Sequence, residues 1–589
     1  MRRASPARRL RITLLAMAFA LSIFTARLVQ MEGLDSATYR SAAQDKQVDT
    51  VPIPVLRGDI TASDGTVLAM TVQTYTVFAD PVEIPVPQRS GVAAKLAGQL
   101  GLAPATVLGL LDRPSSPQYQ VLASNVPVAT GDRISALELP GVDMTPSYAT
   151  AYPNGDLAAD VVGLTNYTGH GNSLAGASGL EYEYNPLLAG KPGSEEIEEG
   201  TDHEPIPQTE LKIRPAVPAR SLRLTINPYI QYDANQVCQQ RVKLVRGRNC
   251  SIVVMTKTGQ VLAMAQWPAS NGLNEPDIGV ANVFAPGSTL KPITVAAALE
   301  KGGQTPMSAY TIPYSIKVDN GAFTFHDAEV HPTERYTIAG ILANSSNVGM
   351  VQVVQHITDR QQYNYLRAFG LGAKSGLGIP ALGSVSGTGL PGESQGLVPA
   401  PGSAGYWNDN PFEYSFGQGL SVTAIQMASI YATIANNGVR VTPTIVAGTT
   451  SADGKFTPAP KPASTRVIQK KTARELMTIL QQVPEVDAQA GERWGQIPGY
   501  PVAAKTGTAQ VSDSSLSKCL CQYGSSYIGI APADNPQLIV AVNIQDPRGK
   551  YYGDEVAGPA FFDVMKFALQ SMKIAPDYAR TPYIRLTAP

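Results

Sequence analysis

The chain has 589 residues, 43% of them hydrophobic and 16% charged, so it is long enough for several domains with buried cores. Its 46 Lys and Arg residues nearly balance 47 Asp and Glu residues, and the net charge of −1 offers no basic face for nucleic acid. Five His and four Cys residues are few for a multinuclear metal site. Nucleic-acid binding and metal catalysis are therefore both disfavoured.

An apolar run with arginines on one flank opens the chain. Residues 12–31 reach about the 20 residues that cross a bilayer, with Arg27 snorkelling to the far interface. A cleaved signal peptide has the same layout, but no small-x-small cleavage site follows the run. Five arginines within residues 1–11 predict a cytoplasmic tail and an extracytoplasmic location for everything after residue 31. We therefore expect an uncleaved, single-pass signal-anchor in the cell membrane.

The four cysteines fit that placement. Outside the cytoplasm they suggest disulfides, and a Cys-x-Cys sequence at 519–521 with one distant pair matches zinc-ligand spacing poorly. Cys238 and Cys250 flank a predicted passage from helix to strand. We expect these two to pair, and the sequence leaves the full connectivity of the four open.

Residues 32–220 mix short strands, helices and turns. A β-hairpin is predicted over 57–69, with Asp64 and the following glycine in its turn. Helices are predicted over 91–100 and 105–111. The region thus reads as a mixed α+β domain.

A proline-rich, acidic stretch, residues 190–219, marks the boundary to a second domain, residues 221–589. Two β-rich runs, 251–256 and 261–266, predict a hairpin near its start. The other predicted elements are helices over 290–300, 338–354, 423–436 and 559–572 and strands over 501–510, 527–531 and 538–544. Strands at both ends with helices between them predict an α/β domain whose terminal strands meet in one sheet.

Three sequences can carry a serine nucleophile. The G-x-S-x-G sequence at 392–396 lies in a loop of Gly, Pro and Ser, whereas a nucleophile elbow needs a strand before it and a helix after it. The S-x-x-K sequence at 515–518 also lies in a polar loop. The other S-x-x-K sequence places Ser288 and Lys291 at the start of a predicted helix, where the lysine can take the hydroxyl proton. A serine that merely caps an ordinary helix is the alternative.

Two further motifs suit the same chemistry. Ser345 and Asn347 lie in a helical stretch, where the hydroxyl can relay a proton and the amide can hold a carbonyl; a polar helix corner is the alternative. Lys505-Thr506-Gly507-Thr508 lies in a predicted strand, whose glycine permits close approach of a ligand that ends in a carboxylate. The other K-[ST]-G sequences, 257–259 and 374–376, lie in turns, where we expect a structural role.

The three motifs occur together in the order and context of the penicillin-recognising enzymes. Family-like segments extend along nearly the whole length, among them 57–69, 284–292 and 504–509. The chain resembles a class B penicillin-binding protein, a monofunctional FtsI-like peptidoglycan D,D-transpeptidase. The resemblance implies an α/β transpeptidase domain, a β-sheet flanked by helices, over 221–589. It also implies a mixed α+β pedestal of the dimerisation type over 32–220 and one transmembrane helix before it.

The resemblance also implies a mechanism. Ser288 would attack the penultimate D-Ala carbonyl of a peptidoglycan stem peptide while Lys291 takes its proton. Ser345 and Lys505 would assist proton transfer as D-Ala leaves, and an amine from a neighbouring strand would resolve the acyl-enzyme. β-Lactam antibiotics would acylate the same serine.

Binding groups and partners follow from the same resemblance. The backbone N–H groups of Ser288 and Thr508 would form the oxyanion hole, and Asn347 would hold the donor amide. The substrate carboxylate would be bound by Lys505, Thr506, Gly507 and Thr508. Neither a cofactor nor a metal is implied. A SEDS-family membrane glycosyltransferase and divisome proteins are the expected partners, in wall synthesis of the septal kind.

Three rival functions remain. A β-lactamase and a β-lactam sensor share the acylatable serine, but the first needs neither a pedestal nor an anchor and the second needs several membrane spans. A scaffold with an inactive site would not need the intact motifs. The chain departs from the family pattern at Asn227, where Asp is usual, at Ala62-Ser63 and at Thr150-Ala151. These positions lie in the pedestal or at its junction, so they bear on contacts between domains rather than on chemistry.

Overall fold

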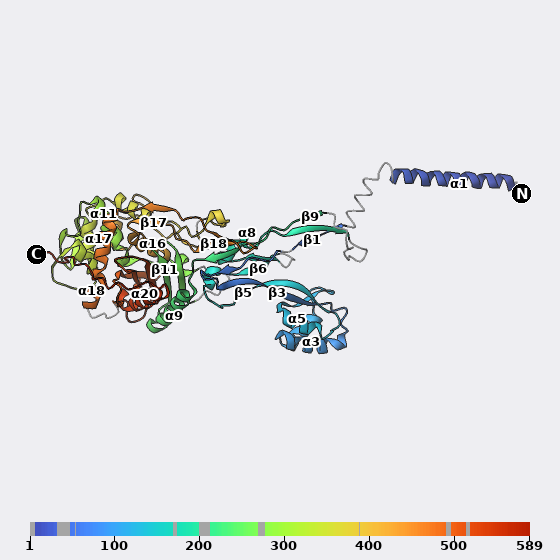
Figure 1. Ribbon diagram of the computed structural model, residues 1–589, viewed down its shortest axis with the longest axis horizontal. Coiled ribbons are helices and arrows are strands. Elements are labelled where there is room, and N and C mark those ends of the chain that lie inside the picture. The colour runs from blue at the N-terminus through green and yellow to red at the C-terminus, as the bar shows by residue number, and fades with distance from the viewer. Residues whose placement is uncertain are drawn as a thin grey trace. The chain divides into compact units, whose positions relative to one another are not determined.

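The computed structural model (Figure 1) divides into two compact units, Met1–Leu56 with Gly190–Ala219, and Arg57–Ala189 with Arg220–Pro589. The residues that the structure describes are 6–31, 48–53, 55–168, 173–198, 212–268, 277–387, 389–489, 496–513 and 519–589. The S-x-x-K sequence at 515–518 therefore lies outside the described residues.

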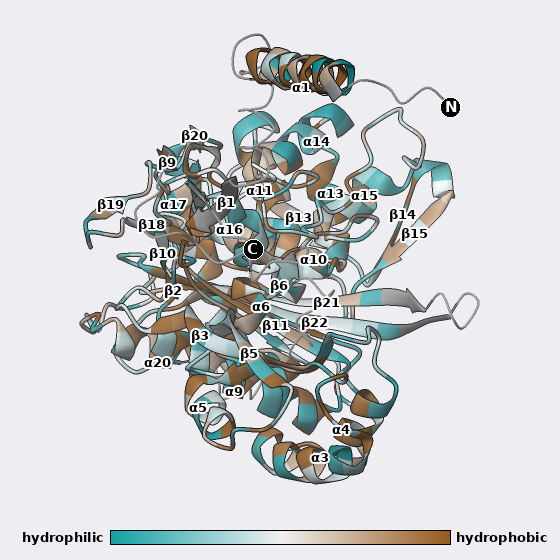
Figure 2. Cartoon of the chain, turned by 90° about the vertical axis from the view of Figure 1, so that its right-hand side faces the viewer, coloured by the Kyte–Doolittle hydropathy of each residue, from teal (hydrophilic) through white to brown (hydrophobic). Residues whose placement is uncertain are grey.

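The first unit holds one long helix and a small sheet. Helix α1, Pro6–Val29, is long and apolar enough over residues 7–29 to cross a membrane, and Figure 2 draws most of it in hydrophobic brown. The antiparallel sheet has the order β1-β8-β9, formed by Val48–Ile53, Gly193–Glu198 and Lys212–Arg214. The acidic run in the expected boundary stretch is thus strand β8, paired with β1.

A seven-stranded sheet joins the two parts of the second unit. Its order is β19-β18-β10-β2-β3-β4, with β5 paired to β3. The strands are β2 Ile60–Thr61, β3 Val67–Ala79, β4 Gln120–Pro127, β5 Val142–Ala151, β10 Ser221–Leu224, β18 Val446–Thr450 and β19 Phe456–Pro458. Strand β10 pairs parallel to β2 and antiparallel to β18, so backbone hydrogen bonds link residues of the two predicted domains. The hairpin predicted over 57–69 is confirmed as β2–β3.

Helices α3 (Val86–Leu100) and α4 (Pro104–Asp112) confirm the two predicted helices and form a separate small core with β3, β4 and α5 (Val128–Ser135). Prolines in the first turn begin α3 and α4, where a missing N–H leaves no bond unmade. The other elements of this part are α6 Ala159–Val162, β6 Thr165–Thr168, β7 Ser173–Gly176, α7 Gly179–Glu183 and α8 Asn185–Leu188.

A buried ion pair supports this part of the unit. Arg57 donates through Nε to Glu181 Oε2 at 2.6 Å and through Nη1 to Asn185 Oδ1 at 2.7 Å. The two charged side chains are only 4% and 2% exposed. Burial raises the pKa of Glu181, and the Arg57 charge opposes that rise, so the carboxylate depends on its partner.

Residues 221–589 are built on a five-stranded antiparallel sheet in the order β12-β11-β23-β22-β21. The strands are β11 Asn249–Thr256, β12 Val261–Trp267, β21 Ala503–Asp513, β22 Cys519–Ala531 and β23 Leu538–Gln545. The predicted meeting of early and late strands is confirmed by the β11–β23 pairing. Strand β22 is longer than the predicted 527–531, because Ser525 and Ser526 are buried and pair with both β21 and β23.

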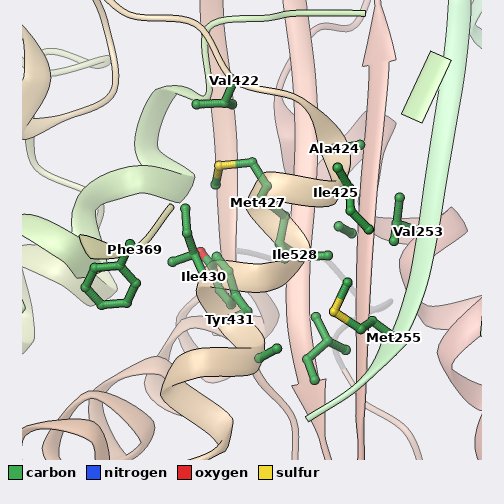
Figure 3. Close-up of a cluster of buried hydrophobic side chains, with 14 of the residues drawn as sticks. Val253, Met255, Phe369, Val422, Ala424, Ile425, Met427, Ile430, Tyr431 and Ile528 are labelled. Carbon is green, nitrogen blue, oxygen red and sulfur yellow. The ribbon is translucent and has the colours of Figure 1, made fainter. Parts of the chain in front are cut away.

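Apolar side chains cover both faces of this sheet. Ile252 and Val254 of β11 pack with α9 (Pro228–Val245) and α20 (Gly558–Ser571), whereas Val253 and Met255 point to the opposite core. Figure 3 shows Val253 and Met255 beside the side chains of α16, Ala424–Ala435. The alternation along β11 is that of a strand buried on both faces.

The disulfide predicted between Cys238 of α9 and Cys250 of β11 is confirmed. The side chains of Cys519 and Cys521 lie outside the described residues. Asn227 caps α9, because its Oδ1 accepts from the backbone N–H groups of Tyr229 and Ile230.

The remaining elements surround the sheet. The helices are α10 Ile278–Ala281, η2 Gly287–Leu290, α11 Lys291–Lys301, η3 Asp319–Gly321, α12 Ile338–Ala343, α13 Asn347–Val354, α14 Asp359–Ala368, η4 Pro380–Leu382, α15 Asn410–Ser415, α17 Lys470–Leu480, α18 Gln482–Gln489 and α19 Gly553–Val556. The strands are β13 Ala309–Ile312, β14 Ser315–Val318, β15 Phe323–His326, β16 Glu334–Thr337, β17 Val439–Val441 and β20 Ser464–Arg466. The helices predicted over 290–300, 423–436 and 559–572 are confirmed as α11, α16 and α20.

Candidate active site

Ser288 lies in the short 3₁₀ turn η2, which leads directly into α11. Gly287 turns the chain there with a left-handed backbone, φ +55°. Tyr431 of α16, buried in the core of Figure 3, donates its hydroxyl to the Thr289 carbonyl at 2.9 Å and so ties η2 to the core. Lys291 is the first residue of α11 and is fully buried, one turn beyond Ser288.

The Lys291 ammonium group joins two of the three predicted motifs. Its Nζ donates to Asn347 Oδ1 at 2.8 Å, and to the carbonyl and the Oγ of Ser345 at 2.5 and 3.3 Å. Burial lowers the pKa of Lys291 well below its usual value, and the nearby Lys505 charge lowers it further, whereas Asp327 opposes the shift. The lowered pKa favours the neutral amine, the form that can accept a proton.

Ser345 occupies a strained turn between two short helices. Its φ is +58°, a left-handed conformation that non-glycine residues adopt at a cost, often at functional sites. The prediction of one continuous helix over 338–354 is therefore wrong, because α12 ends at Ala343 and a second helix, α13, begins at Asn347. Ser346 causes the restart: its Oγ accepts from the Gly349 N–H at 2.8 Å as the N-cap of α13.

Asp327 holds this turn in place, and sequence reasoning missed it. The carboxylate accepts from the backbone N–H groups of Asn347 and Val348 at 2.5 and 3.0 Å and from Ser346 Oγ at 2.8 Å. It also pairs with His331 Nε2 at 3.0 Å and is only 6% exposed. No short sequence motif predicts the role of Asp327, because its partners lie about twenty positions away in the chain. The one hint in the sequence is an Asp directly after a β-rich run.

Lys505 is the second buried amine of the site. It lies on β21, and its Nζ donates to Thr506 Oγ1 at 3.1 Å. Burial lowers the pKa of Lys505 to about 8, with Asp487 and Asp554 opposing. Because this amine also lowers the pKa of Lys291, two cations share one electrostatic environment.

Glycines let three backbone segments meet around the serine. A Cβ on Gly507 would lie 2.8 Å from the Pro286 oxygen, and one on Gly287 would lie 2.9 Å from the Thr508 oxygen. A Cβ on Gly417 would lie 2.0 Å from the Gly287 oxygen, and the Gly287 N–H donates to the Gly417 oxygen. Strand β21, η2 and the segment after α15 are therefore in direct backbone contact.

The Thr508 hydroxyl has a defined orientation. Its Oγ1 accepts from the backbone N–H of Gly553 at 3.0 Å, which leaves its own proton free to donate to a bound group. Gly553 is itself packed against β21, where a Cβ would lie 2.5 Å from the Gly507 oxygen. The threonine is thus a donor beside a buried cation at the edge of the sheet.

The structure brings the three predicted motifs together. Within the part of the chain that it describes, no hydrogen bond joins Ser288 Oγ to Lys291 Nζ, as is common for catalytic pairs before substrate binds. The other serine candidate, 392–396, lies in a loop without the strand and helix of a nucleophile elbow. The sequence 257–259 is the β11–β12 turn, and 374–376 lies in an irregular segment. A hydroxyl, an amine with a lowered pKa and backbone donors at a helix start together suit acyl transfer.

Comparisons with known proteins agree with this geometry. The family described as the penicillin binding protein transpeptidase domain matches residues 250–566, and the penicillin-binding protein dimerisation domain matches residues 52–224. Penicillin-binding protein PbpB of Mycobacterium tuberculosis is 32% identical over 96% of this chain and 85% of its own length. Peptidoglycan D,D-transpeptidase FtsI of Escherichia coli K12 is 30% identical over 89% of this chain and 85% of its own length.

Solved structures give the same family. A peptidoglycan synthetase from Bifidobacterium adolescentis matches with a TM-score of 0.73 and 28% identity, over 92% of this chain and all of that one. Penicillin binding protein 3 of Mycobacterium tuberculosis, complexed with aztreonam, matches with a TM-score of 0.66 and 28% identity, over 92% of this chain and all of that one. The resemblance inferred from the three motifs is confirmed, and the chain belongs to the class B penicillin-binding proteins.

Proposed function

We propose that this protein is a peptidoglycan D,D-transpeptidase that cross-links stem peptides through an acyl-enzyme on Ser288. The observation that carries the proposal is Lys291, a fully buried amine with a lowered pKa, one helical turn from Ser288 and hydrogen-bonded to Ser345 and Asn347. A relative at 30% identity bears the name peptidoglycan D,D-transpeptidase.

In the acylation step, Ser288 Oγ attacks the carbonyl carbon of the penultimate D-Ala, and Lys291 Nζ accepts the hydroxyl proton. The backbone N–H groups of Ser288 and Thr508 donate to the resulting oxyanion. The proton passes from Lys291 through Ser345, with Lys505 assisting, to the nitrogen of the terminal D-Ala as the peptide bond breaks. An amine of a second stem peptide then attacks the ester, and Ser288 regains its proton.

Substrate binding uses the rest of the site. Asn347 Oδ1 accepts from Lys291, and its Nδ2 donates to the His326 oxygen at 3.4 Å. The second N–H of this amide is the one that donates to the carbonyl of the donor peptide. The terminal carboxylate binds at β21, to the Lys505 ammonium, the Gly507 backbone and the hydroxyls of Thr506 and Thr508. A β-lactam presents the same carbonyl and carboxylate, and acylates Ser288.

We assign the chain to four regions: a cytoplasmic tail (1–11), a membrane anchor (12–31), a pedestal (32–220) and a transpeptidase domain (221–589). The five arginines that precede the apolar helix support a cytoplasmic N-terminus, with the catalytic domain on the other side of the membrane. The expected partners are a SEDS-family glycosyltransferase, which the anchor helix contacts, and divisome proteins during septal wall synthesis.

The test is covalent labelling by a fluorescent penicillin, followed by intact mass, together with release of D-Ala from a stem-peptide donor. We expect stable labelling of the wild type and none of Ser288→Ala. Ser394→Ala, which removes the serine of the G-x-S-x-G loop, is the matched control and should label normally. Rapid loss of the label would indicate a β-lactamase, and folded wild type that never labels would indicate a scaffold.

A further inference from the structure

We propose that the C-terminal segment, residues 581–588, positions the active site by fixing the N-terminal end of α12, whose other end leads into Ser345. The inference rests on the proposed acylation of Ser288. It concerns a part of the chain that carries none of the three motifs and that follows the closing helix α20.

The segment docks on β16 through its backbone. Thr587 bridges antiparallel to Tyr336, and the Ala588 N–H donates to the Arg335 oxygen at 2.9 Å. Strand β16 in turn pairs with β13, so the segment is bridged to the edge of a two-stranded sheet. Its side chains alternate as a strand's do: Ile584 and Leu586 pack against the main hydrophobic core.

The same segment completes the N-terminus of α12. The Thr337 N–H donates to the Leu586 oxygen at 2.9 Å, and Thr337 Oγ1 donates to the Arg585 oxygen at 2.7 Å. The other early N–H groups have nearby acceptors: Ser308 for Ile338, Pro306 for Ala339 and Thr337 Oγ1 for Gly340. Residues about 250 positions away thus accept from one of the first four backbone N–H groups of α12. They also orient the hydroxyl of its N-cap residue, Thr337.

Gly340 is shaped to receive this segment. A Cβ at that position would lie 1.9 Å from the Leu586 oxygen, and all three nearest atoms belong to Leu586. Glycine is otherwise unfavourable inside a helix, where alanine is the most favourable residue. The position therefore gives up helix stability for contact with the C-terminal segment.

The consequence reaches the catalytic turn because α12 is short. Six residues span about 9 Å, so a shift at one end of the helix moves the other. The far end carries Ser345 in its left-handed conformation, with its hydrogen bonds to Lys291. The segment also contacts α18, where Gln482 Nε2 donates to the Pro582 oxygen at 2.9 Å, and α18 packs against β21.

The experiment compares four full-length or shortened chains: the wild type, a chain that ends at Arg580, Gly340→Ala, and Gly340→Ala in the shortened chain. The readouts are the second-order rate constant of acylation by a fluorescent penicillin, measured well below the melting temperature, and the melting temperature itself. Gly98→Ala, a helical glycine of α3 with no atom near its Cβ position, is the matched control and should acylate normally in both lengths.

We expect the shortened chain and Gly340→Ala each to acylate about tenfold more slowly, because small displacements of catalytic groups have effects of that size or larger. The combination should be no slower than the shortened chain alone. Gly340→Ala should lower the melting temperature of the full chain and raise that of the shortened chain, because the segment it clashes with is then absent.

Normal acylation by both single variants would overturn the inference, as would multiplicative rate losses or a melting shift of the same sign in both lengths. If the shortened chain does not fold, normal acylation by full-length Gly340→Ala alone overturns it. Failure of the proposed function is distinguishable, because the wild type would then not be labelled at all.

Discussion

Asp327→Asn tests whether the catalytic turn is held by a charge. The substitution keeps the shape of the side chain and one acceptor oxygen for the backbone N–H groups of Asn347 and Val348. It replaces the second oxygen with a donor, so the hydrogen bond from Ser346 Oγ is lost.

The size of the effect follows from these bonds. Hydrogen bonds to a charged group contribute about 1.5–3 kcal/mol each, against about 1 kcal/mol for neutral ones. Two weakened bonds and one lost bond amount to about 3 kcal/mol that no longer favours the strained Ser345 turn. Since tenfold in rate corresponds to about 1.4 kcal/mol, acylation should slow by roughly a hundredfold.

The pH dependence should change as well. Lys291 acts as a base only when neutral, so acylation rises with pH through the pKa of Lys291. Burial and the Lys505 charge lower that pKa, and the Asp327 charge raises it. Removing the carboxylate should therefore lower the pKa further and move the acid limb of the rate profile to lower pH.

The assay is the rate of labelling by a fluorescent penicillin across pH, with circular dichroism to confirm folding. His331→Gln is the control, because it leaves the three bonds from Asp327 to the turn in place. Its rate should stay close to that of the wild type. A folded Asp327→Asn protein with the normal rate and an unmoved acid limb would refute the role assigned to Asp327.

Two further predictions concern stability. Arg57→Met should lower the free energy of unfolding by about 3–5 kcal/mol in urea melts, because it leaves the buried Glu181 carboxylate without its charged partner. Adding Glu181→Leu should recover most of this loss. An unchanged free energy of unfolding in the single variant would contradict the role of the buried pair. Replacing Cys238 and Cys250 together by Ala should cost about 3 kcal/mol, the closure entropy of a loop of this length. A reducing agent should then lower the melting temperature of the wild type and leave the variant unchanged; equal shifts in both would contradict it.

The strands and long helices were predictable because their signals are local. The β11–β12 hairpin, α11, α16 and α20 each show in their own apolar periodicity. The break between α12 and α13 was not predicted, although the polar residues 344–347 interrupt the apolar pattern of 338–354. The Ser346 cap and the distant Asp327 hold the chain in the turn there. Likewise, β22 was predicted only over 527–531, and pairing with both neighbouring strands makes residues 524–526 part of it.

The sequence by itself determined the family, and it predicted the reacting groups, because Ser288, Lys291, Ser345, Asn347 and Lys505 carry their chemistry in their residue types and their order. It also determined the apolar N-terminal helix, whereas the pairing of Cys238 with Cys250 was an expectation that the structure confirmed. Tertiary structure alone decided what positions those groups. Asp327, Gly417 and the segment 581–588 act through contacts with residues far away in the chain, and such contacts leave no local pattern. The lowered pKa of Lys291 also depends on tertiary structure, because its largest cause is burial, which only the folded chain creates.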